Sequence, residues 1–535
     1  MTAHFDTFVR DRLPALAEQP EFLFELPELQ YPERLNAAVA LIGGGDPEAL
    51  AVLNDAGRWT FGEMDALSDR IARVLAEEEG LVPGNRVLLR GPNGAMLFAC
   101  WLGVLKAGGV VVATMPILRA GEIATILERA QVSHAIVDAR CLDDFTPAAA
   151  QAGTVRSLLT YQGDDGTGEL EARLQGAAPD FEPAATLRDD VALIAFTSGT
   201  TGKPKGCVHF HRDVLACADS FARYVLKPEA GSRWLCSAPV AFTFGLGMQL
   251  IFPWRFGGTA VTVEQPGPKA LLEAVERFRV TNLATAPTAY KAMLGALAEH
   301  DVSSLGTCVS AGEHLPAATW EAWREATGLG IVNGIGATEM MHIFISASGE
   351  DIRPGATGKA VPGYRACVLD EEGRPLPHGT GRLGVKGPTG CRYFDDPRQA
   401  AYVSNGWNVT GDTYRADEEG YFWYVARSDD MIISAGYNIA APEVENALYA
   451  HPAVAECAVI GVPCEERGQR VKAFVVPADG HAADDSLATA LQEHVKATIA
   501  PYKYPRDVEF VAALPKTPTG KLQRFALRSA GRPRP

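Results

Sequence analysis

A run of hydroxyl, glycine and lysine residues follows a strongly apolar segment near the middle of the chain. The apolar segment is Val191-Ala192-Leu193-Ile194-Ala195-Phe196, and the polar run is Thr197-Ser198-Gly199-Thr200-Thr201-Gly202-Lys203-Pro204-Lys205-Gly206. Glycines let backbone N–H groups approach an anion, hydroxyls donate hydrogen bonds, and lysines supply positive charge. The pattern predicts a buried strand that opens into a polyphosphate-binding loop. It is not a Walker A loop, because only two residues separate Gly199 from Gly202 and Pro204 follows Lys203.

Four further patterns carry side chains suited to nucleotide chemistry. In chain order they are Ser310-Ala311-Gly312-Glu313, Gly334-Ile335-Gly336-Ala337-Thr338-Glu339, Thr410-Gly411-Asp412-Thr413 with Arg427-Ser428-Asp429-Asp430, and Pro515-Lys516-Thr517-Pro518-Thr519-Gly520-Lys521-Leu522. A glutamate offers the oxygen ligand that a hard cation such as Mg²⁺ prefers. Each pattern alone also fits a structural role as a turn, a solvated charged face or an exposed lysine.

Together and in this order, the patterns resemble the adenylate-forming superfamily of acyl-CoA and aryl-CoA ligases. The resemblance implies that Thr338 contacts the adenylate phosphate, that Glu339 binds Mg²⁺ and that Lys521 is catalytic. Asp429 is the implied hinge of a mobile C-terminal domain. The implied nucleotide-binding residues are Thr197, Ser198, Gly199, Thr200, Thr201, Lys205, Ala311, Gly312, Glu313, Asn333, Gly334, Ile335, Gly336, Asp412 and Arg427. Many members of the superfamily have an aromatic residue at the position of Ile335.

A further segment, residues 239–247, occupies the place where members of the superfamily shape the acyl pocket. With residues 310–313 and 338–343 it resembles the benzoate-CoA ligase branch, and most of all 2-aminobenzoate-CoA ligases. Phenylalanines can form flat walls for an aryl ring, and a histidine offers a polar contact for a ring substituent. The candidate substrate residues are Phe242, Thr243, Phe244, Gly245, Gly336 and His342. The phenylalanines and the histidine also fit a purely structural role in the core.

The resemblance implies an AMP-forming aryl-CoA ligase. Benzoate or 2-aminobenzoate would react with ATP to give aryl-AMP, and CoA would then take the acyl group. The expected partners are thus a small aryl carboxylic acid, ATP and CoA, with Mg²⁺ as the metal ion. Two other classes stay open: a stand-alone adenylation enzyme that loads a carrier protein, and a non-catalytic nucleotide-binding homologue. A luciferase-like oxygenase has no positive support in the sequence.

Composition limits the remaining possibilities. A chain of 535 residues exceeds what one core usually organises, so two or more domains are expected. The net charge of -16 opposes general binding to nucleic acids or anionic membranes. The ten cysteines form no C-x-x-C pair, and neither a secretory signal nor an apolar run of membrane-spanning length occurs. These features predict a cytoplasmic protein, monomeric or homodimeric, without a nucleic-acid or membrane partner.

The expected fold is α/β. Strands over 86–90, 110–113 and 135–137 alternate with helices over 94–107 and 121–130, which predicts βαβ units and a largely parallel sheet. Thr60 and Glu63 form a capping box at the start of another helix, and a further helix is expected over 267–278. Residues 146–190 are interpreted as a connector between two α/β layers, and a small β subdomain is expected after residue 360. We expect a large N-terminal domain over 1–428 and a small mobile α+β domain over 429–535.

Overall fold

The protein folds into two compact units in a computed structural model that describes residues 2–197, 204–427, 431–434, 437–464, 468–499, 501–516 and 522–530. The first unit comprises Met1–Leu315, Thr319–Ala366 and Val385–Asn408, and the second comprises Pro316–Ala318, Cys367–Gly384 and Val409–Pro535. The expected domain boundary after residue 428 stays a prediction, since residues 428–430 lie outside the described residues. Among the described residues, every helix is too short or too polar to span a bilayer.

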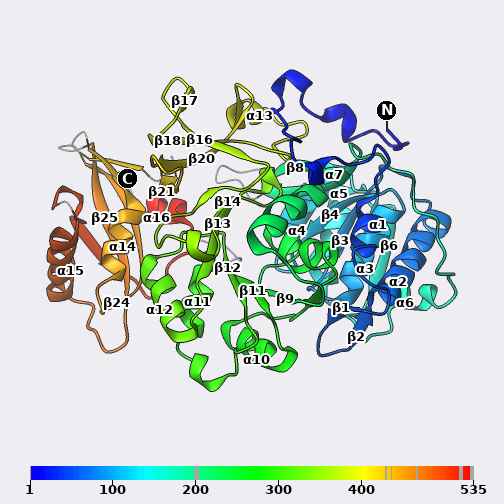
Figure 1. Ribbon diagram of the computed structural model, residues 1–535, viewed down its shortest axis with the longest axis horizontal. Helices are drawn as coiled ribbons and strands as arrows, with labels where there is room; N and C mark the ends of the chain where they lie inside the picture. The colour runs from blue at the N-terminus through cyan, green and yellow to red at the C-terminus, as the bar shows by residue number, and fades with distance from the viewer. Residues whose placement is uncertain are drawn as a thin grey trace. The chain divides into compact units, whose positions relative to one another are not determined.

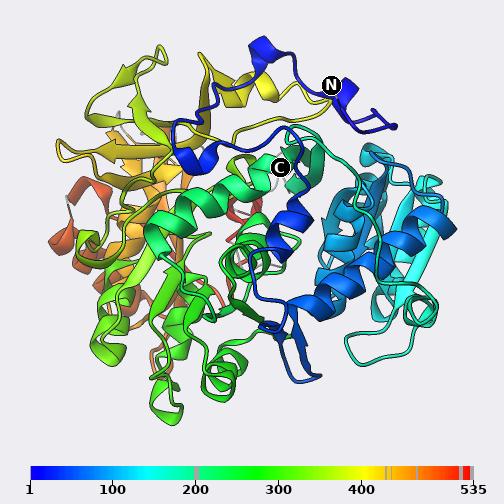
Figure 2. The same cartoon turned by 45° about the vertical axis from the view of Figure 1, so that its right-hand side comes forward.

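The first sheet of unit 1 has the strand order β6-β5-β3-β4-β7-β8 and is parallel except for the β7–β8 pair. Its helices α2 and α3 pack side by side (Figures 1 and 2). The strands are β3 (Arg86–Arg90), β4 (Val110–Thr114), β5 (His134–Asp138), β6 (Ser157–Tyr161), β7 (Val191–Thr197) and β8 (Lys205–Phe210). The helices are α1 (Ala37–Ile42), α2 (Phe61–Arg73), α3 (Ala95–Lys106), α4 (Ala120–Ala130), α5 (Leu142–Ala152) and α6 (Glu169–Leu174).

Local sequence signals account for much of this sheet. The predicted capping box begins α2, because Glu63 N–H donates to Thr60 Oγ1 at 3.1 Å and Thr60 N–H donates to Glu63 Oε2 at 2.8 Å.

The interpretation of residues 146–190 as a connector is wrong, since this stretch contains most of α5, all of β6 and all of α6. Strand β6 was missed because it is an edge strand in which only Leu159 and Tyr161 are buried, which leaves a weak apolar pattern.

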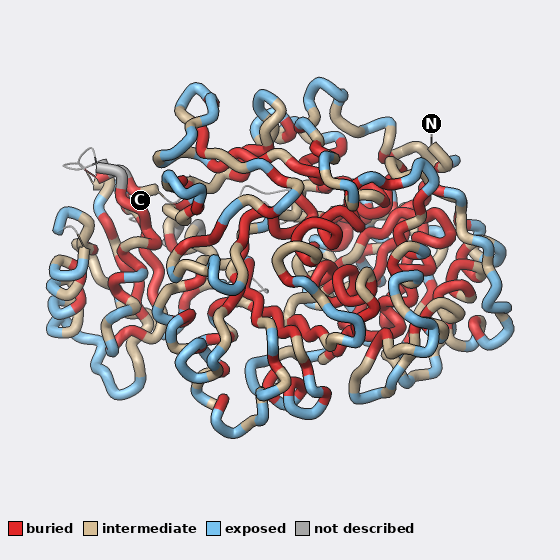
Figure 3. The backbone as a smooth tube through the Cα atoms, in the orientation of Figure 1, coloured by how far each residue is buried: buried red, intermediate tan, exposed pale blue. Residues whose placement is uncertain are grey.

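The second sheet of unit 1 has the order β15-β14-β13-β12-β11-β9-β10-β1-β2. Its strands are β1 (Leu50–Leu53), β2 (Arg58–Thr60), β9 (Arg233–Cys236), β10 (Thr259–Val261), β11 (Asn282–Thr285), β12 (Thr307–Ser310), β13 (Ile331–Gly336), β14 (Ile343–Ser346) and β15 (Lys359–Ala360). The further helices of the chain up to residue 402 are α7 (His211–Cys217), which packs against β7 and β8, α8 (Thr243–Leu246), α9 (Phe252–Arg255), α10 (Pro268–Phe278), α11 (Pro287–Met293), α12 (Ala317–Thr327) and α13 (Gln399–Tyr402), which packs against β19. Wide turns extend the helical segments through Ala218–Leu226 and Gly247–Ile251. The central strands of both sheets are buried (Figure 3).

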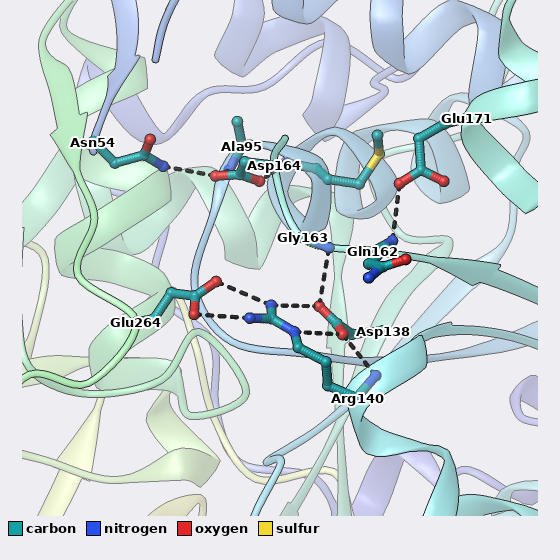
Figure 4. A network of polar contacts seen from close by, with 10 residues as sticks. Asn54, Ala95, Asp138, Arg140, Gln162, Gly163, Asp164, Glu171 and Glu264 are labelled. Atoms are coloured by element: carbon teal, nitrogen blue, oxygen red, sulfur yellow. Dashed lines mark hydrogen bonds and ion pairs between the residues drawn. The ribbon is translucent and has the colours of Figure 1, made fainter. Parts of the chain in front are cut away.

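Polar contacts join the two sheets of unit 1 at the loop after β6 (Figure 4). Asp164 in this loop caps α3, because its carboxylate accepts from the N–H groups of Ala95 at 2.9 Å and Met96 at 2.8 Å. The same carboxylate accepts from Asn54 Nδ2, which lies just after β1 of the second sheet, at 2.6 Å. Arg140 makes a second connection, since its guanidinium donates to Asp138 of β5 and to Glu264 after β10. These charge-assisted bonds fix one sheet against the other and so hold the segments that each contributes to a shared site.

The remaining strands form two further sheets. One has the order β17-β16-β18-β20-β19, with β21 paired to β20, and the other has the order β23-β22-β25-β24, with β26 paired to β25. The strands are β16 (Arg365–Leu369), β17 (Pro375–Leu376), β18 (Gly379–Lys386), β19 (Val403–Ser404), β20 (Trp407–Ala416), β21 (Phe422–Arg427), β22 (Met431–Ser434), β23 (Tyr437–Ala440), β24 (Val454–Cys464), β25 (Gly468–Pro477) and β26 (Asp507–Phe510). Helices α14 (Ala441–Tyr449), α15 (Asp485–Thr498) and α16 (Arg524–Ala530) accompany the last sheet. Leu448, Val459, Val475 and Leu491 belong to its core, so the C-terminal region has the expected α+β character.

Candidate active site

The predicted strand before the hydroxyl-rich run is β7, and the end of the run, from Lys205, begins the antiparallel strand β8. Thr197 at the end of β7 pairs with Lys205 at the start of β8. The Oγ1 atom of Thr197 is buried and accepts or donates no hydrogen bond within the described part of the chain. The residues between the strands include the candidates Ser198, Gly199, Thr200 and Thr201, which lie outside the described residues.

Lys205 and Glu339 meet although 134 positions separate them in the sequence. Glu339 lies in a short helical turn, Thr338–Met340, directly after β13, and only 7% of its surface is exposed. The Nζ atom of Lys205 lies 3.5 Å from Glu339 Oε1 and donates a hydrogen bond to the hydroxyl of Tyr393 at 2.7 Å. Tyr393 in turn donates to Glu339 Oε1. Burial and the charge of Glu339 raise the pKa of Tyr393, so its hydroxyl stays protonated.

Two histidines hold the backbone around this turn. His209 on β8 donates from Nε2 to the carbonyl oxygen of Thr338 at 2.7 Å, which ties the start of the turn to the strand that carries Lys205. His342 lies just after the turn and donates from Nε2 to the carbonyl oxygen of Phe244 at 3.3 Å. Hydrogen bonds of the two histidines therefore hold the backbone on both sides of the turn that carries the side chains of Thr338 and Glu339.

Close packing explains the two glycines of the 334–336 segment. A Cβ atom at Gly334 would lie 2.7 Å from the side chain of Ile343, and one at Gly336 would lie 2.8 Å from the carbonyl oxygen of His342. Both contacts come from the antiparallel β13–β14 pair. The hydroxyl of Ser346 on β14 also donates to the carbonyl oxygen of Asn333 at 2.6 Å. The hairpin thus keeps the backbone of Gly336 exposed beside half-buried Ile335.

The candidates Ala311, Gly312 and Glu313 follow the neighbouring strand. β12 and β13 are parallel, with Ser310 opposite Asn333, so both candidate segments begin at the carboxyl ends of neighbouring strands, on the same side of the sheet. Gly312 has φ +92°, a left-handed backbone that favours glycine, and it is exposed. Ligands of open α/β sheets bind at the carboxyl ends of parallel strands, where these two segments lie.

The substrate candidates Phe242, Thr243, Phe244 and Gly245 lie at the start of helix α8. Phe242 and Thr243 line a small apolar cavity together with Trp101, Val111, Ala113, Leu193, Ile194, Ala195, Val240, Ala241 and Leu246. Phe244 instead packs against His342, with 5.6 Å between the ring centroids. Gly245 and Gly247 make room for this packing, since a Cβ atom would lie 2.2 Å from the carbonyl oxygen of Pro239 at Gly245 and 2.3 Å from Cδ2 of His342 at Gly247.

His342 is enclosed by aromatic rings. Its ring stacks on Phe221 at 5.6 Å and contacts Phe252 edge-on at 4.5 Å, measured between ring centroids. Burial lowers the pKa of His342 to about 3, although the hydrogen bond to Phe244 partly opposes the shift. The neutral ring therefore carries its proton on Nε2, and Nδ1 is a buried acceptor that has no hydrogen-bond partner within the described part of the chain.

Asp412 and Arg427 belong to the second unit. They face each other across the antiparallel β20–β21 pair, and Arg427 Nε lies 4.0 Å from Asp412 Oδ1. Gly411 before the aspartate has φ +77°. The pair is thus neighbouring in space as well as in the motif pattern. Lys521 and Asp429 lie outside the described residues.

Comparison with known proteins decides the family. A model of the AMP-binding enzyme family matches residues 42–393, and a model of the AMP-binding enzyme C-terminal domain matches residues 443–521. The chain belongs to the AMP-binding enzyme family. The expected membership in the adenylate-forming superfamily is therefore confirmed, as is the expectation of an AMP-forming acid–thiol ligase.

Similar members of the AMP-binding enzyme family include named aryl-CoA ligases. The benzoate–CoA ligase of Thauera aromatica is 38% identical over 518 residues, covering 94% of this chain and 98% of the relative. A solved anthranilate CoA ligase in complex with anthranoyl-AMP has a TM-score of 0.89 at 34% identity, with 94% of this chain and 99% of that chain covered. A benzoate CoA ligase from Burkholderia xenovorans LB400 has a TM-score of 0.84 at 33% identity, with 92% and 99% covered. These matches confirm the expected fold class and the placement in the benzoate-CoA ligase branch.

The sequence reasoning missed two residues that contact the candidate residues Thr338 and Glu339, namely His209 and Tyr393. Neither belongs to a glycine-rich or charged motif. Tyr393 reaches the site because residues 391–394 pair with the edge of β8, where it lies opposite Cys207. The only local signal was a tyrosine two residues before Asp395-Asp396-Pro397, which is not specific for any chemistry.

Proposed function

We propose that this chain is an ATP-dependent aryl-CoA ligase that activates benzoate or 2-aminobenzoate. The acid carboxylate attacks the α-phosphorus of ATP, giving aryl-AMP and pyrophosphate. The thiol of CoA then attacks the acyl carbonyl carbon, and AMP leaves with the electrons of the broken C–O bond. No nucleophilic side chain is needed, because both nucleophiles belong to the substrates. The work of the protein is positioning and charge neutralisation.

One structural relationship carries this proposal. His342 joins the candidate acid-binding segment to the candidate phosphate-binding segment, since it bonds to Phe244 on one side and its backbone abuts Gly336 on the other. An acid held beside Phe242 and Phe244 would thus have its carboxylate near the residues that follow β13. Adenylation needs this proximity of carboxylate and α-phosphate.

The aryl preference is supported by the character of the surrounding side chains. Aromatic rings enclose His342, and the cavity beside Phe242 is lined almost entirely by apolar side chains. Aromatic walls favour flat ring faces. The named benzoate and anthranilate ligases among the relatives point to the same substrate class. Because His342 Nδ1 is an unused acceptor, it suits the N–H donor of an ortho-amino group.

On the nucleotide side, Lys205, Thr338 and Glu339 are proposed to hold the phosphates and Mg²⁺. The described residues contain no cluster of three or more His, Cys, Asp or Glu side chains suited to a metal ion. Mg²⁺ nevertheless fits, since it is commonly bound through one or two carboxylates with phosphate oxygens and water completing the shell. Lys205 and Tyr393 both contact Glu339 through Oε1. When bound, Mg²⁺ would neutralise charge on the phosphates.

The C-terminal residues complete the proposal. Lys521 is proposed to neutralise charge during adenylation, Asp412 and Arg427 to bind the ribose, and Asp429 to act as the hinge of a domain over 429–535. Rotation of this domain would withdraw Lys521 before the CoA thiol approaches. The chain is proposed to act as a monomer or homodimer.

A panel of acids tests the proposed function. Purified protein would be given ATP, Mg²⁺ and CoA with benzoate, 2-aminobenzoate, 4-methylbenzoate or octanoate, and acyl-CoA would be measured by chromatography. The highest kcat/KM is expected for benzoate or 2-aminobenzoate. A higher kcat/KM for octanoate would contradict the aryl assignment.

Two parallel assays separate the alternatives. Replacing CoA by a holo-carrier protein distinguishes a carrier-loading adenylation enzyme, which would prefer the carrier as acceptor. ATP–pyrophosphate exchange dependent on the aryl acid distinguishes a catalyst from a non-catalytic homologue, which would show none.

A further inference from the structure

Tyr393 contacts both charged candidates, Lys205 and Glu339, although it lies outside the motif patterns named in the sequence. Segment 391–394 runs antiparallel to β8, with Val208 N–H donating to the carbonyl oxygen of Arg392 at 2.9 Å and Phe394 N–H donating to that of Gly206 at 3.3 Å. This pairing places Tyr393 at the edge of the strand that carries Lys205. Only 1% of the tyrosine is exposed, so its hydroxyl is confined to partners within the fold.

The directions of the hydrogen bonds around Tyr393 follow from chemistry alone. An ammonium group only donates, an ionised carboxylate only accepts, and a phenol hydroxyl does both. The Lys205 ammonium therefore donates to the phenol oxygen at 2.7 Å, and the phenol proton points to Glu339 Oε1. The hydroxyl thus connects the ammonium of Lys205 to the carboxylate of Glu339 through two successive hydrogen bonds.

This link also keeps the Lys205 ammonium and the Glu339 carboxylate from making a short direct contact. Lys205 Nζ lies 3.5 Å from Glu339 Oε1, whereas a direct ammonium–carboxylate hydrogen bond has a length of about 2.7–2.9 Å. Lys205 thus has a neutral phenol as its near acceptor. The longer separation weakens the Coulomb attraction between the ammonium and the carboxylate, so the lysine is more easily released to a phosphate.

Tyr393 is itself held in place. Its N–H donates to the side-chain oxygen of Gln399 at 3.0 Å, and its ring meets Tyr402 edge-on at a centroid distance of 5.8 Å. Gln399 is fixed in turn, because its amide donates to the carbonyl oxygens of Glu18 at 3.0 Å and Cys391 at 3.2 Å. The phenol is therefore a rigid support rather than a mobile surface group.

We propose that Tyr393 is a positioning residue for nucleotide binding. Its hydroxyl holds Glu339 through Oε1, which orients the carboxylate toward a phosphate-bound cation, and it holds Lys205 ready for transfer to the phosphates. This inference rests on the nucleotide-binding roles proposed above for Lys205 and Glu339. It adds to them a residue that fixes both groups before the nucleotide arrives.

The test is Tyr393→Phe, which removes the hydroxyl and retains the ring. ATP–pyrophosphate exchange is expected to show a roughly ten- to hundredfold higher KM for MgATP, the size expected when hydrogen bonds to charged groups are lost. The KM for the aryl acid is expected to change little. The matched control is Tyr290→Phe, because Tyr290 is a buried tyrosine whose hydroxyl donates to the backbone carbonyl oxygens of Leu283 and Val309. This control is expected to leave both KM values near those of the wild type.

A binding measurement without turnover provides an independent readout. Mn²⁺ bound in the presence of a non-hydrolysable ATP analogue would be counted by electron paramagnetic resonance. Tyr393→Phe is expected to weaken Mn²⁺ binding, and the loss is expected to shrink in a Glu339→Gln background, since the hydroxyl acts through that carboxylate. Equal losses in both backgrounds, or no loss in either, would overturn the proposal. If the wild type binds Mn²⁺ and the analogue but forms no aryl-AMP, the proposed function fails while Tyr393 remains testable.

A second probe covers the case in which Tyr393→Phe does not fold. 3-Fluorotyrosine placed at position 393 keeps the hydroxyl and reports its surroundings by ¹⁹F resonance. Addition of the ATP analogue with Mg²⁺ is expected to shift this resonance in the wild-type background and to shift it less with Glu339→Gln. An unchanged resonance on saturation with the analogue would contradict a positioning role.

Discussion

The imidazole of His342 donates from Nε2 to the carbonyl oxygen of Phe244 at 3.3 Å, and this bond determines which ring nitrogen can still accept a hydrogen bond. With the proton on Nε2, the Nδ1 atom can only accept. Because burial lowers the pKa of His342 to about 3, the ring stays neutral over the ordinary assay range. A substituent that donates a hydrogen bond would satisfy this acceptor, whereas a methyl or fluoro group would leave it unpaired.

His342→Leu is therefore expected to reduce the preference for 2-aminobenzoate over benzoate about tenfold, the cost of roughly one hydrogen bond in a buried site. His342→Asn is the matched variant, since its amide oxygen restores an acceptor and should retain part of the preference. The ratio of kcat/KM values for the two acids is the measurement. The KM for ATP should remain unchanged in both variants, and the wild-type ratio should not vary between about pH 5.5 and 8.5. An identical ratio of kcat/KM values in His342→Leu, His342→Asn and the wild type would exclude His342 as the source of the substrate preference.

Lys521→Ala is expected to lower the rate of aryl-AMP formation about 10²- to 10³-fold, the usual effect of removing one group that neutralises transition-state charge. Thioester formation from supplied aryl-AMP should be largely retained, because no ATP phosphates take part in that step. Single-turnover assays of the two half-reactions measure this difference. Lys516→Ala is the matched control in the same segment, since Lys516 is engaged in an ion pair with Glu456 at 2.7 Å. Equal loss of both half-reactions in Lys521→Ala would contradict the assigned role.

The sequence predicted those parts of the fold that depend on local patterns. The capping box at Thr60 and the strand that ends at Thr197 follow from residue type and apolar periodicity, and both are present. Strand β6 escaped detection because its outer residues are solvated at a sheet edge, so burial does not shape its sequence. Such a strand is defined by its pairing with β5, which is a property of the folded chain.

The same distinction applies to the candidate site. Lys205 and Glu339 are visible in the sequence because they belong to ordered motifs with glycines and hydroxyls. Tyr393 and His209 are not, since each acts through a contact made by distant strand pairing: one reaches Glu339 from segment 391–394, and the other reaches the backbone of Thr338 from β8. Residue type alone does not distinguish them from ordinary core residues.

Asp429→Pro is expected to separate the two half-reactions in the opposite sense from Lys521→Ala. Lys521 is needed at the ATP phosphates during adenylation, but the CoA thiol must later reach the same acyl carbonyl, so one domain arrangement does not serve both steps. A hinge absorbs such a rotation in a few backbone angles, and proline locks φ near about -65°. The variant should retain ATP–pyrophosphate exchange and lose most thioester formation if it is held in the adenylating arrangement. Wild-type thioester formation from aryl-AMP would show that the hinge lies elsewhere.

A buried ion pair behind the site gives the last prediction, which concerns stability. Arg392 Nη1 lies 2.7 Å from Asp213 Oδ2, and both side chains are fully buried. The guanidinium lies between the rings of Phe22 and Phe210, at 4.0 and 4.1 Å from their centroids. Asp213 also accepts the N–H of Phe210 at 3.0 Å. Burial alone would raise the pKa of Asp213, but Arg392 first and His209 second hold it below its ordinary value.

Removing one partner of this pair leaves the other charge buried, which typically costs about 3–5 kcal/mol. Asp213→Asn and Arg392→Met should each lower the urea midpoint at pH 7.5, and the double variant should recover part of the loss. The pH dependence separates the two single variants. The depressed pKa of Asp213 contributes stability that is present above the unfolded value of about 4 and is lost as the pH falls toward the folded value, so the gap between wild type and Asp213→Asn should narrow below about pH 5. In Arg392→Met the carboxyl of Asp213 keeps only His209 and Arg212 against the effect of burial, so its pKa is less depressed and this variant should gain less stability than the wild type as the pH rises toward about 5. A pH profile of Arg392→Met parallel to that of the wild type would contradict the assignment of Arg392 as the main partner that keeps Asp213 ionised.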